Sequence, residues 1–220
     1  MRNLKMAALV IAAFTVACST WAAALERADI SLPAPVMSGG KPLMQALKER
    51  QTARAFSDRK LPPQVLSNLL WAAFGINRPE SGKRTAPSAR NWQEIEIYVI
   101  LEEGAYLYEP RANVLKTVVK SDLRRLAGTQ DFVATAPLNL VYVADTAKMK
   151  GASLEDRMLY AGADTGFISQ NVYLFCASEG LATVVRGSVE RKPLAAALRL
   201  PDNKIITLAQ TVGYPPARGR

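Results

Sequence analysis

The sequence predicts a single α+β domain rather than a doubly wound sheet, because helical and strand patterns are mixed along it without strict alternation. Three segments carry this prediction. Residues 154–178 show the longest helical pattern, which Gly180 is expected to end. Residues 138–144 form a nearly continuous apolar run, which is typical of a buried strand. In residues 94–99, Ile and Val alternate with Glu and Tyr, which indicates a strand with one solvated face.

The chain before these strands is expected to hold two helices. Residues 25–42 are rich in proline and glycine, so an extended lead-in is predicted there. Residues 43–50 are a short helix candidate. Residues 64–74 are a stronger one, opened by a proline pair and stopped by Gly75. Residues 77–93 are polar and are expected to be irregular.

The second half of the chain adds short elements around the central patterns. Residues 106–108, just after Gly104, are the expected hairpin partner of the first strand. The remaining expected elements are helices at 121–127, 129–134 and 193–198 and strands at 181–185 and 205–211. No internal repeat or low-complexity segment interrupts this series.

The first two dozen residues have the pattern of a secretory signal peptide. Arg2 and Lys5 precede an apolar run over residues 6–17, and a small-residue A-x-A site at residues 22–24 follows. We therefore predict a signal peptide at 1–24, a mature domain at 25–220, and export, in the first instance to the periplasm. Lipid anchoring through Cys18 is the alternative, and it is less favoured because the residues before it lack the usual leucine. The apolar run is too short to span a bilayer comfortably.

The composition excludes several kinds of catalytic site. The chain has no histidine, so a Ser-His-Asp triad, a Cys-His dyad and a histidine zinc site are ruled out, and no metal is expected. Without the signal only Cys176 remains, inside an apolar stretch, where it is expected to be a buried hydrophobe. The net charge of +9 falls to +7 without the two signal cations, which suggests an anionic ligand, and no nucleic-acid-binding motif is present. An enzyme of this composition is expected to take its chemistry from a cofactor.

Four segments, in this order, resemble the nitroreductase family. They are RQTARAF at 50–56, PSARNWQ at 87–93, the end of the long helix with its Gly-Leu-Ala turn at 180–182, and VRGS at 185–188 followed by a strand into Gly-Tyr-Pro at 213–215. The resemblance spans most of the predicted mature chain. It implies an antiparallel core sheet flanked by helices, an intertwined homodimer, and FMN held non-covalently at the subunit interface.

The first motif implies contacts to the phosphate end of FMN. By this resemblance Arg50 binds the phosphate, for which a guanidinium fork is well matched. Thr52 offers a hydroxyl to the phosphate or ribityl chain, and Gln51 belongs to the same motif. Arg54 corresponds to the basic residue near N1 and O2 of the ring, where reduced flavin gathers negative charge. A solvated basic helix end is the alternative for both arginines.

The later motifs imply contacts to the ring. Asn91, with Ser88 beside it, resembles the asparagine that bonds the flavin edge, although a polar loop capped by its own side chains is the alternative. Val185, Arg186 and Gly187 resemble the turn whose backbone amides face N5 and O4. Many relatives carry glutamate where Arg186 stands, so a cation beside the ring is expected to alter substrate preference. In the resembling family the residues after Gly-Tyr-Pro often supply a cation to the phosphate. Here only residues 217–220 follow the two prolines, so Arg218 or Arg220 is the candidate for that contact.

The function that this resemblance implies is an FMN-dependent oxidoreductase that uses a small-molecule electron donor and an acceptor such as a nitroaromatic or a quinone. Export makes NAD(P)H a scarce donor. A substrate dehydrogenation, as in the azoline-oxidising relatives that residues 84–89 resemble, is therefore also open. The alternatives are an exported flavin-binding or partner-binding module without turnover, and a basic exported protein without flavin.

Overall fold

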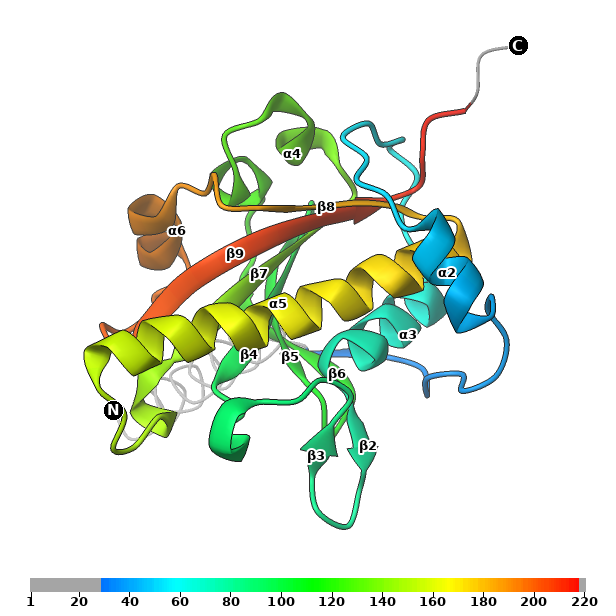
Figure 1. Ribbon diagram of the computed structural model, residues 1–220. Helices are drawn as coiled ribbons and strands as arrows, with labels where there is room; N and C mark the ends of the chain where they lie inside the picture. The colour runs from blue at the N-terminus through cyan, green and yellow to red at the C-terminus, as the bar shows by residue number, and fades with distance from the viewer. Residues whose placement is uncertain (1–28, 218–220) are drawn as a thin grey trace, which may run out of the picture.

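The computed structural model describes residues 29–217 and shows one large sheet with helices on both faces (Figure 1). Its seven strands lie in the order β1-β6-β5-β4-β7-β9-β8, and every neighbouring pair is antiparallel. The strands are β1 (Ile30–Ser31), β4 (Ile95–Leu101), β5 (Gly104–Glu109), β6 (Val114–Val119), β7 (Leu138–Asp145), β8 (Ala182–Arg186) and β9 (Lys204–Gly213). The α+β prediction is confirmed, whereas the predicted signal peptide at 1–24 lies outside the described residues.

The helices form one layer on each face of the sheet. One layer contains α2 (Leu43–Glu49), α3 (Pro63–Phe74) and α5 (Leu154–Glu179), with α5 running the length of the sheet (Figure 1). The other contains α4 (Asp131–Thr135), α6 (Arg191–Ala197) and the 3-10 turn η2 (Arg124–Ala127). Two further 3-10 turns, η1 (Ala89–Asn91) and η3 (Thr146–Lys148), lie in connections.

Helix α5 forms where the sequence predicts it because both of its ends are capped. The Ser153 hydroxyl accepts a hydrogen bond from the Asp156 N–H at 3.0 Å, and two acidic residues in the first turn suit the positive end of the helix dipole. At the other end Gly180 takes the left-handed conformation, with φ 69°, and stops the helix. Its sheet-facing side chains, including Ile168 and Val172, are buried.

Strand β4 corrects one expectation, because it has no solvated face. Ile97 and Val99 pack under α3 and α5 as expected, but Tyr98 and Ile100 on the other face are also buried, at 4% and 0% exposure. The second helix layer covers them. Glu96 on this face keeps partial exposure, and it pairs with Lys204 of β9 at 2.7 Å.

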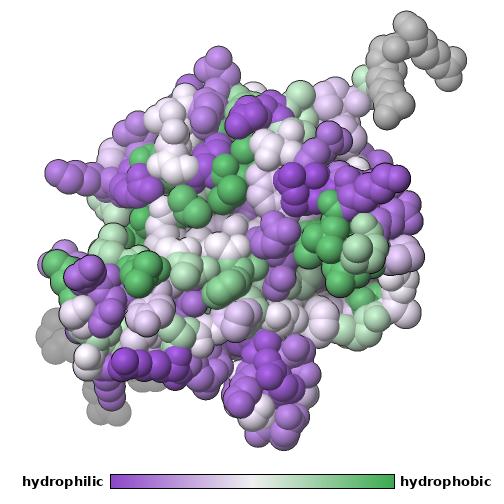
Figure 2. Space-filling view, in the orientation of Figure 1, coloured by the Kyte–Doolittle hydropathy of each residue, from purple (hydrophilic) through white to green (hydrophobic). Residues whose placement is uncertain are grey.

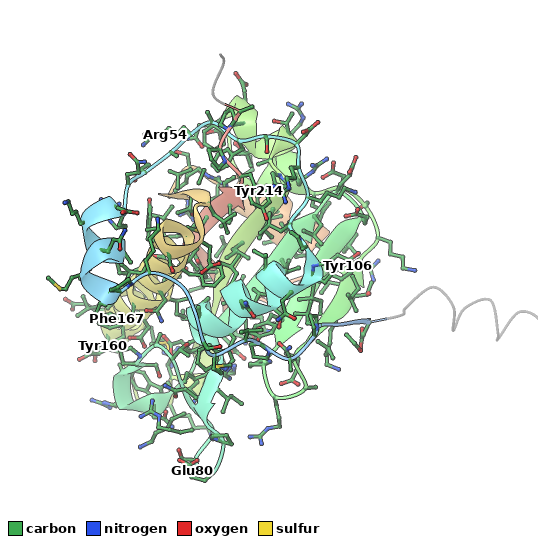
Figure 3. The ribbon with its side chains drawn as sticks, turned by 90° about the vertical axis from the view of Figure 1, so that its right-hand side faces the viewer. Arg54, Glu80, Tyr106, Tyr160, Phe167 and Tyr214 are labelled. Carbon is green, nitrogen blue, oxygen red and sulfur yellow. The ribbon has the colours of Figure 1, made fainter. Side chains whose placement is uncertain are left out.

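Four short strands were not anticipated from the sequence. β6 continues the hairpin series after β5, through a turn where Asn113 has φ 52°, and β1 pairs with its outer edge. Within the stretch expected to be irregular, β2 (Ile76–Arg78) and β3 (Lys83–Arg84) form a separate antiparallel hairpin. This hairpin projects from the body of the molecule, with Glu80 at its tip (Figure 3).

Candidate functional site

The segment after α2 runs beside β8, at one edge of the sheet, and carries the first motif. The Ala53 N–H donates to the Thr183 carbonyl at 3.0 Å, which fixes the segment against the strand. Thr52 and Arg54 are left exposed on either side of that contact, while Arg50, which ends α2, is half-buried. The extended backbone therefore presents the polar side chains of the motif outward along one edge.

Tyr173 of α5 connects this segment to β8, a role that the sequence analysis did not predict. Its hydroxyl accepts the Val185 N–H at 3.1 Å and shares a hydrogen bond with the Thr52 hydroxyl at 3.0 Å. The Arg50 guanidinium carbon lies 5.2 Å from the centroid of its ring, within cation–π range. One buried phenol thus positions three of the predicted site residues, although a tyrosine in an apolar helical pattern is indistinguishable from core by sequence.

A cavity of about 640 Å³ opens beside these residues, between α2, the end of α5 and the start of β8. Lys41, Lys48, Arg50 and Gln51 line it, together with one acidic side chain, Glu49. Lys41 pairs with Glu49 at 2.5 Å. Neither Lys48 nor Arg50 has a carboxylate within ion-pair distance among residues 29–217. Two uncompensated cations at one cavity favour an anionic ligand such as a phosphate.

Arg186 lies elsewhere than the sequence suggested. Its guanidinium points into the opposite face of the sheet, where it donates to the Ala127 carbonyl at 2.7 Å, Asn139 Oδ1 at 2.9 Å and Thr211 Oγ1 at 2.7 Å. Burial lowers its pKa to about 10. Successive residues of a strand point to opposite faces, so the side chain of Arg186 is not a cation beside a ligand at the end of β8. Only the backbone here, with the exposed Gly187, is available on that side.

The second motif forms a tight, strained turn around η1. The Ser88 hydroxyl accepts the Gln93 N–H at 2.8 Å, and Asn91 Oδ1 accepts the Gln93 side-chain amide at 3.0 Å. Arg90, Asn91 and Gln93 all have positive φ, at 50°, 56° and 48°. Left-handed conformations of this kind are costly for residues other than glycine and cluster at functional sites. The turn keeps Asn91 exposed, as a ligand contact requires.

Helix α5 also supports this second motif. The Asp164 carboxylate accepts the Ala89 N–H at 2.9 Å, and the Trp92 ring meets the ring of Tyr160 edge-on at 5.9 Å. Asp164 and Tyr173 are nine positions apart on one helix, so the supports of the two motifs are separated by about 13 Å along its axis. A single chain therefore brings Arg50, Thr52 and the end of β8 together and leaves the Asn91 turn about 13 Å away along α5.

A buried acid pair lies directly behind the second motif. Glu94 has no exposed surface, and neither of its carboxylate oxygens has a hydrogen-bond partner. Desolvation, followed by repulsion from Asp164, raises its pKa to about 7. Desolvation likewise raises the pKa of Asp164. A proton is therefore held within this pair at mildly acidic pH, under the turn that carries Ser88 and Asn91.

The outer surfaces of α5 and α2 are unusually apolar. Figure 2 shows hydrophobic patches on this face of the molecule, which is the face that carries α5. Exposed large apolar side chains on the two helices are Leu43, Met44, Leu47, Leu154, Met158, Leu159 and Phe167. In Figure 3, Arg54, Tyr160 and Phe167 all lie along this same side. The two motifs and the apolar surface thus share one face, which is typical of an interaction surface.

The described residues offer neither a metal site nor a reactive thiol. No group of three His, Cys, Asp or Glu side chains among them is arranged to hold a metal ion. Cys176 is buried as expected, and burial raises the pKa of its thiol. Within residues 29–217, no helix has the length and apolar character needed to cross a membrane. The predicted contact of Arg218 lies outside the described residues.

The sequence profile of the Nitroreductase family matches residues 47–214, which include both motifs and the β8 turn. The chain belongs to the nitroreductase family. A Methanocaldococcus jannaschii protein named as a candidate nitroreductase, MJ1384, is 30% identical over 176 residues, which cover 76% of this chain and 88% of that protein. Members of the nitroreductase family are generally FMN-dependent oxidoreductases, so this membership supports an oxidoreductase.

Solved structures of the nitroreductase family share the fold. A candidate nitroreductase from Ralstonia eutropha JMP134 superposes with a TM-score of 0.82 and 41% identity, over 86% of this chain and 90% of that one. The Escherichia coli microcin synthetase McbBCD complex contains a chain with a TM-score of 0.66 at 21% identity, over 84% and 78% of the two chains. The second likeness shows the fold alone.

Proposed function

We propose that this chain is an FMN-dependent oxidoreductase that acts on a small organic substrate such as a nitroaromatic or a quinone. The observation that carries the proposal is the 640 Å³ cavity at the start of β8, where Lys48 and Arg50 have no ion-pair partner among the described residues and the hydroxyl of Thr52 lies nearby, bonded to the lining residue Tyr173. That donor set fits a ligand with a phosphate at one end and a polar chain beyond it. Membership of the nitroreductase family, whose members generally bind FMN, supports FMN as this ligand.

Each residue of this cluster has a role suited to its chemistry. Arg50 and Lys48 would hold the phosphate, Thr52 would bond the phosphate or ribityl oxygens, and Arg54 would place a positive charge near the ring. The space beside Gly187 is open, since a Cβ added there would meet nothing nearer than Leu208 Cδ2 at 4.0 Å. The flavin ring could therefore come close to the backbone at this position. When bound, FMN supplies the hydride-type redox chemistry that amino-acid side chains lack.

A second copy of the chain would complete the site. The supports of the Asn91 turn and of the Arg50 segment are about 13 Å apart along α5. Arg54 of the first motif and Tyr160, which contacts Trp92 of the second, both lie on the side of the molecule that carries the exposed Phe167 (Figure 3). Packing that face against its own copy would bury side chains such as Phe167, now 48% exposed, and would bring the Asn91 turn of one copy toward the Arg50 cluster of the other. This arrangement is the intertwined homodimer expected from the family.

The absorbance spectrum of the purified protein, recorded after FMN addition and desalting, tests the cofactor. Retained visible flavin bands that are released on denaturation are the expected result. Arg50→Gln should weaken FMN binding at least tenfold, because a charge-assisted hydrogen bond contributes about 1.5–3 kcal/mol. Arg111→Gln, at an exposed position on the β5–β6 turn, is the matched control and should bind normally. A folded protein that retains no flavin would overturn the proposal.

Turnover separates an enzyme from a flavin-binding module. Bound flavin should be bleached by a donor such as NADH or NADPH, and its colour should return when a nitroaromatic or a quinone is added under anaerobic conditions. Flavin that binds tightly but exchanges no electrons with any donor or acceptor would favour the module without turnover. Bleaching by an organic substrate, and not by NAD(P)H, would instead favour the substrate dehydrogenation.

We further propose that residues 1–24 direct export and are removed. The support is the order of charged, apolar and small residues in that segment. Sequencing the N-terminus of protein recovered from the periplasm of a bacterial host should give Leu25 as the first residue. An N-terminus at Cys18 bearing lipid would establish anchoring, and an intact Met1 in the cytoplasm would refute export.

A further inference from the structure

A second cavity, of about 360 Å³, lies away from the proposed flavin site. It is enclosed by β1, the start of α3 and the adjoining ends of β4 to β7, and none of its lining residues also lines the 640 Å³ cavity. In Figure 3 its tyrosine, Tyr106, lies on the opposite side of the molecule from Arg54 and Phe167. The two cavities are therefore independent features of the fold.

The walls of this cavity are apolar and come from separate elements. Leu32, Leu66, Leu101, Leu115 and Leu138 supply most of them, from the lead-in, α3, β4, β6 and β7. Side chains held by five elements make a preformed space rather than a gap under one mobile loop. Cavities of about 300–1,000 Å³ with apolar walls and a few polar groups are typical of small-molecule sites.

One polar group is available inside this cavity. The Tyr106 side chain is buried, at 6% exposure, yet its hydroxyl has no hydrogen-bond partner among residues 29–217. Burial raises its pKa, so the hydroxyl stays protonated and can both donate and accept. A ligand atom inside the cavity would supply the missing partner.

Carboxylates outnumber cations at the rim. Lys60 pairs with Glu103 and with Glu102, the latter at 3.1 Å, while Arg124 is held by Asp122 at 2.8 Å. These pairs leave the rim carboxylate of Asp58 with no hydrogen bond or ion pair to any described residue.

The geometry points to a binding site for a small amphiphilic amine, with its hydrophobic body between the leucines and its ammonium group beside Asp58. The apolar walls select the body, and the carboxylate excess at the rim selects a positive over a negative end group. A body of the size of an indole or naphthalene ring is suited to the volume. This site is separate from flavin binding and does not depend on the function proposed above.

Matched probes that share a ring and differ in charge test the proposal. Tryptamine and indole-3-propionate would be titrated into FMN-loaded protein, or into protein with excess FMN present, and followed by calorimetry. Tryptamine should bind at least tenfold more tightly than the anion. Equal binding of the two probes, or no heat from tryptamine up to millimolar concentration, would overturn the proposal.

Two variants locate the binding. Asp58→Asn should weaken tryptamine binding threefold to tenfold, whereas Asp202→Asn, at an exposed carboxylate in the turn before β9, should leave it unchanged. Leu101→Trp should fill the cavity and abolish binding, with thermal melting as the check on folding. Since Asp58 is an exposed surface residue, its variant remains informative if the tryptophan variant does not fold. Tryptamine binding that is insensitive to Asp58→Asn, or lost equally in Asp202→Asn, would place it elsewhere and refute the assignment.

Discussion

Replacing Glu94 by glutamine should stabilise the protein at alkaline pH and hardly change it at pH 5. The carboxyl is fully buried, has no hydrogen-bond partner, and has its pKa raised from an ordinary value of 4.5 to about 7. Between these two values the folded state binds more protons than the unfolded state, so stability falls as pH rises. Above pH 7 the loss is complete, at about 3 kcal/mol for a shift of this size.

The amide of glutamine has nearly the same shape and carries no charge at any pH, so it should escape this loss. Glu94→Gln should therefore gain about 2–3 kcal/mol over the natural protein at pH 8, with the difference vanishing toward pH 5. Urea unfolding at several pH values from 5 to 8 measures it. Glu80→Gln, at the exposed tip of the β2–β3 hairpin, is the control and should leave the free energy of unfolding unchanged at every pH. A stability difference independent of pH would refute the raised pKa of Glu94.

Three other changes probe separate parts of the structure. Tyr173→Phe should cost about 1–2 kcal/mol in urea unfolding and weaken FMN binding several-fold, because the Thr52 hydroxyl loses its partner. Gly128→Ala should cost about 2–4 kcal/mol by the same assay, since its Cβ would lie 2.0 Å from Nη1 of the hydrogen-bonded Arg186; an unchanged midpoint would contradict this. Phe167→Asp should convert a dimer to a monomer in light scattering, and a natural protein that is already monomeric would remove the basis for that prediction.

The helices and the central strands were predictable because their signals are local. The long pattern of α5 and its terminal Gly180 depend only on residues within the helix and its caps. Strand β6 escaped notice because polar residues, including the exposed Lys116, interrupt its apolar pattern at the sheet edge. The second buried face of β4 depends on η2, α4 and α6, which are distant in sequence and which no reading of residues 94–99 reveals.

The sequence motifs predicted which residues are available to a ligand, but they did not predict where the Arg186 side chain points or that Tyr173 supports the site. The exposure of Thr52, Arg54 and Asn91 agrees with their predicted roles, which remain predictions. The interior placement of the Arg186 side chain follows from the register of β8, a property of the whole sheet. Tyr173 supports the site from within a helix, where its periodicity matches ordinary core packing.

The separation of the two motifs along α5 has a genetic consequence in a two-copy site. Each pocket would combine the Arg50 cluster of one copy with the Asn91 turn of the other. A chain carrying Arg50→Gln would damage the pocket that contains its own Arg50 cluster. A chain carrying Asn91→Ala would damage the pocket that contains its partner's Arg50 cluster. In a mixed dimer both defects fall in one pocket, and the other pocket is wholly natural. Two inactive variants, unfolded and refolded together, should therefore recover up to a quarter of the natural flavin content, counting one intact pocket in the half of the dimers that are mixed. A site built within a single chain would recover none.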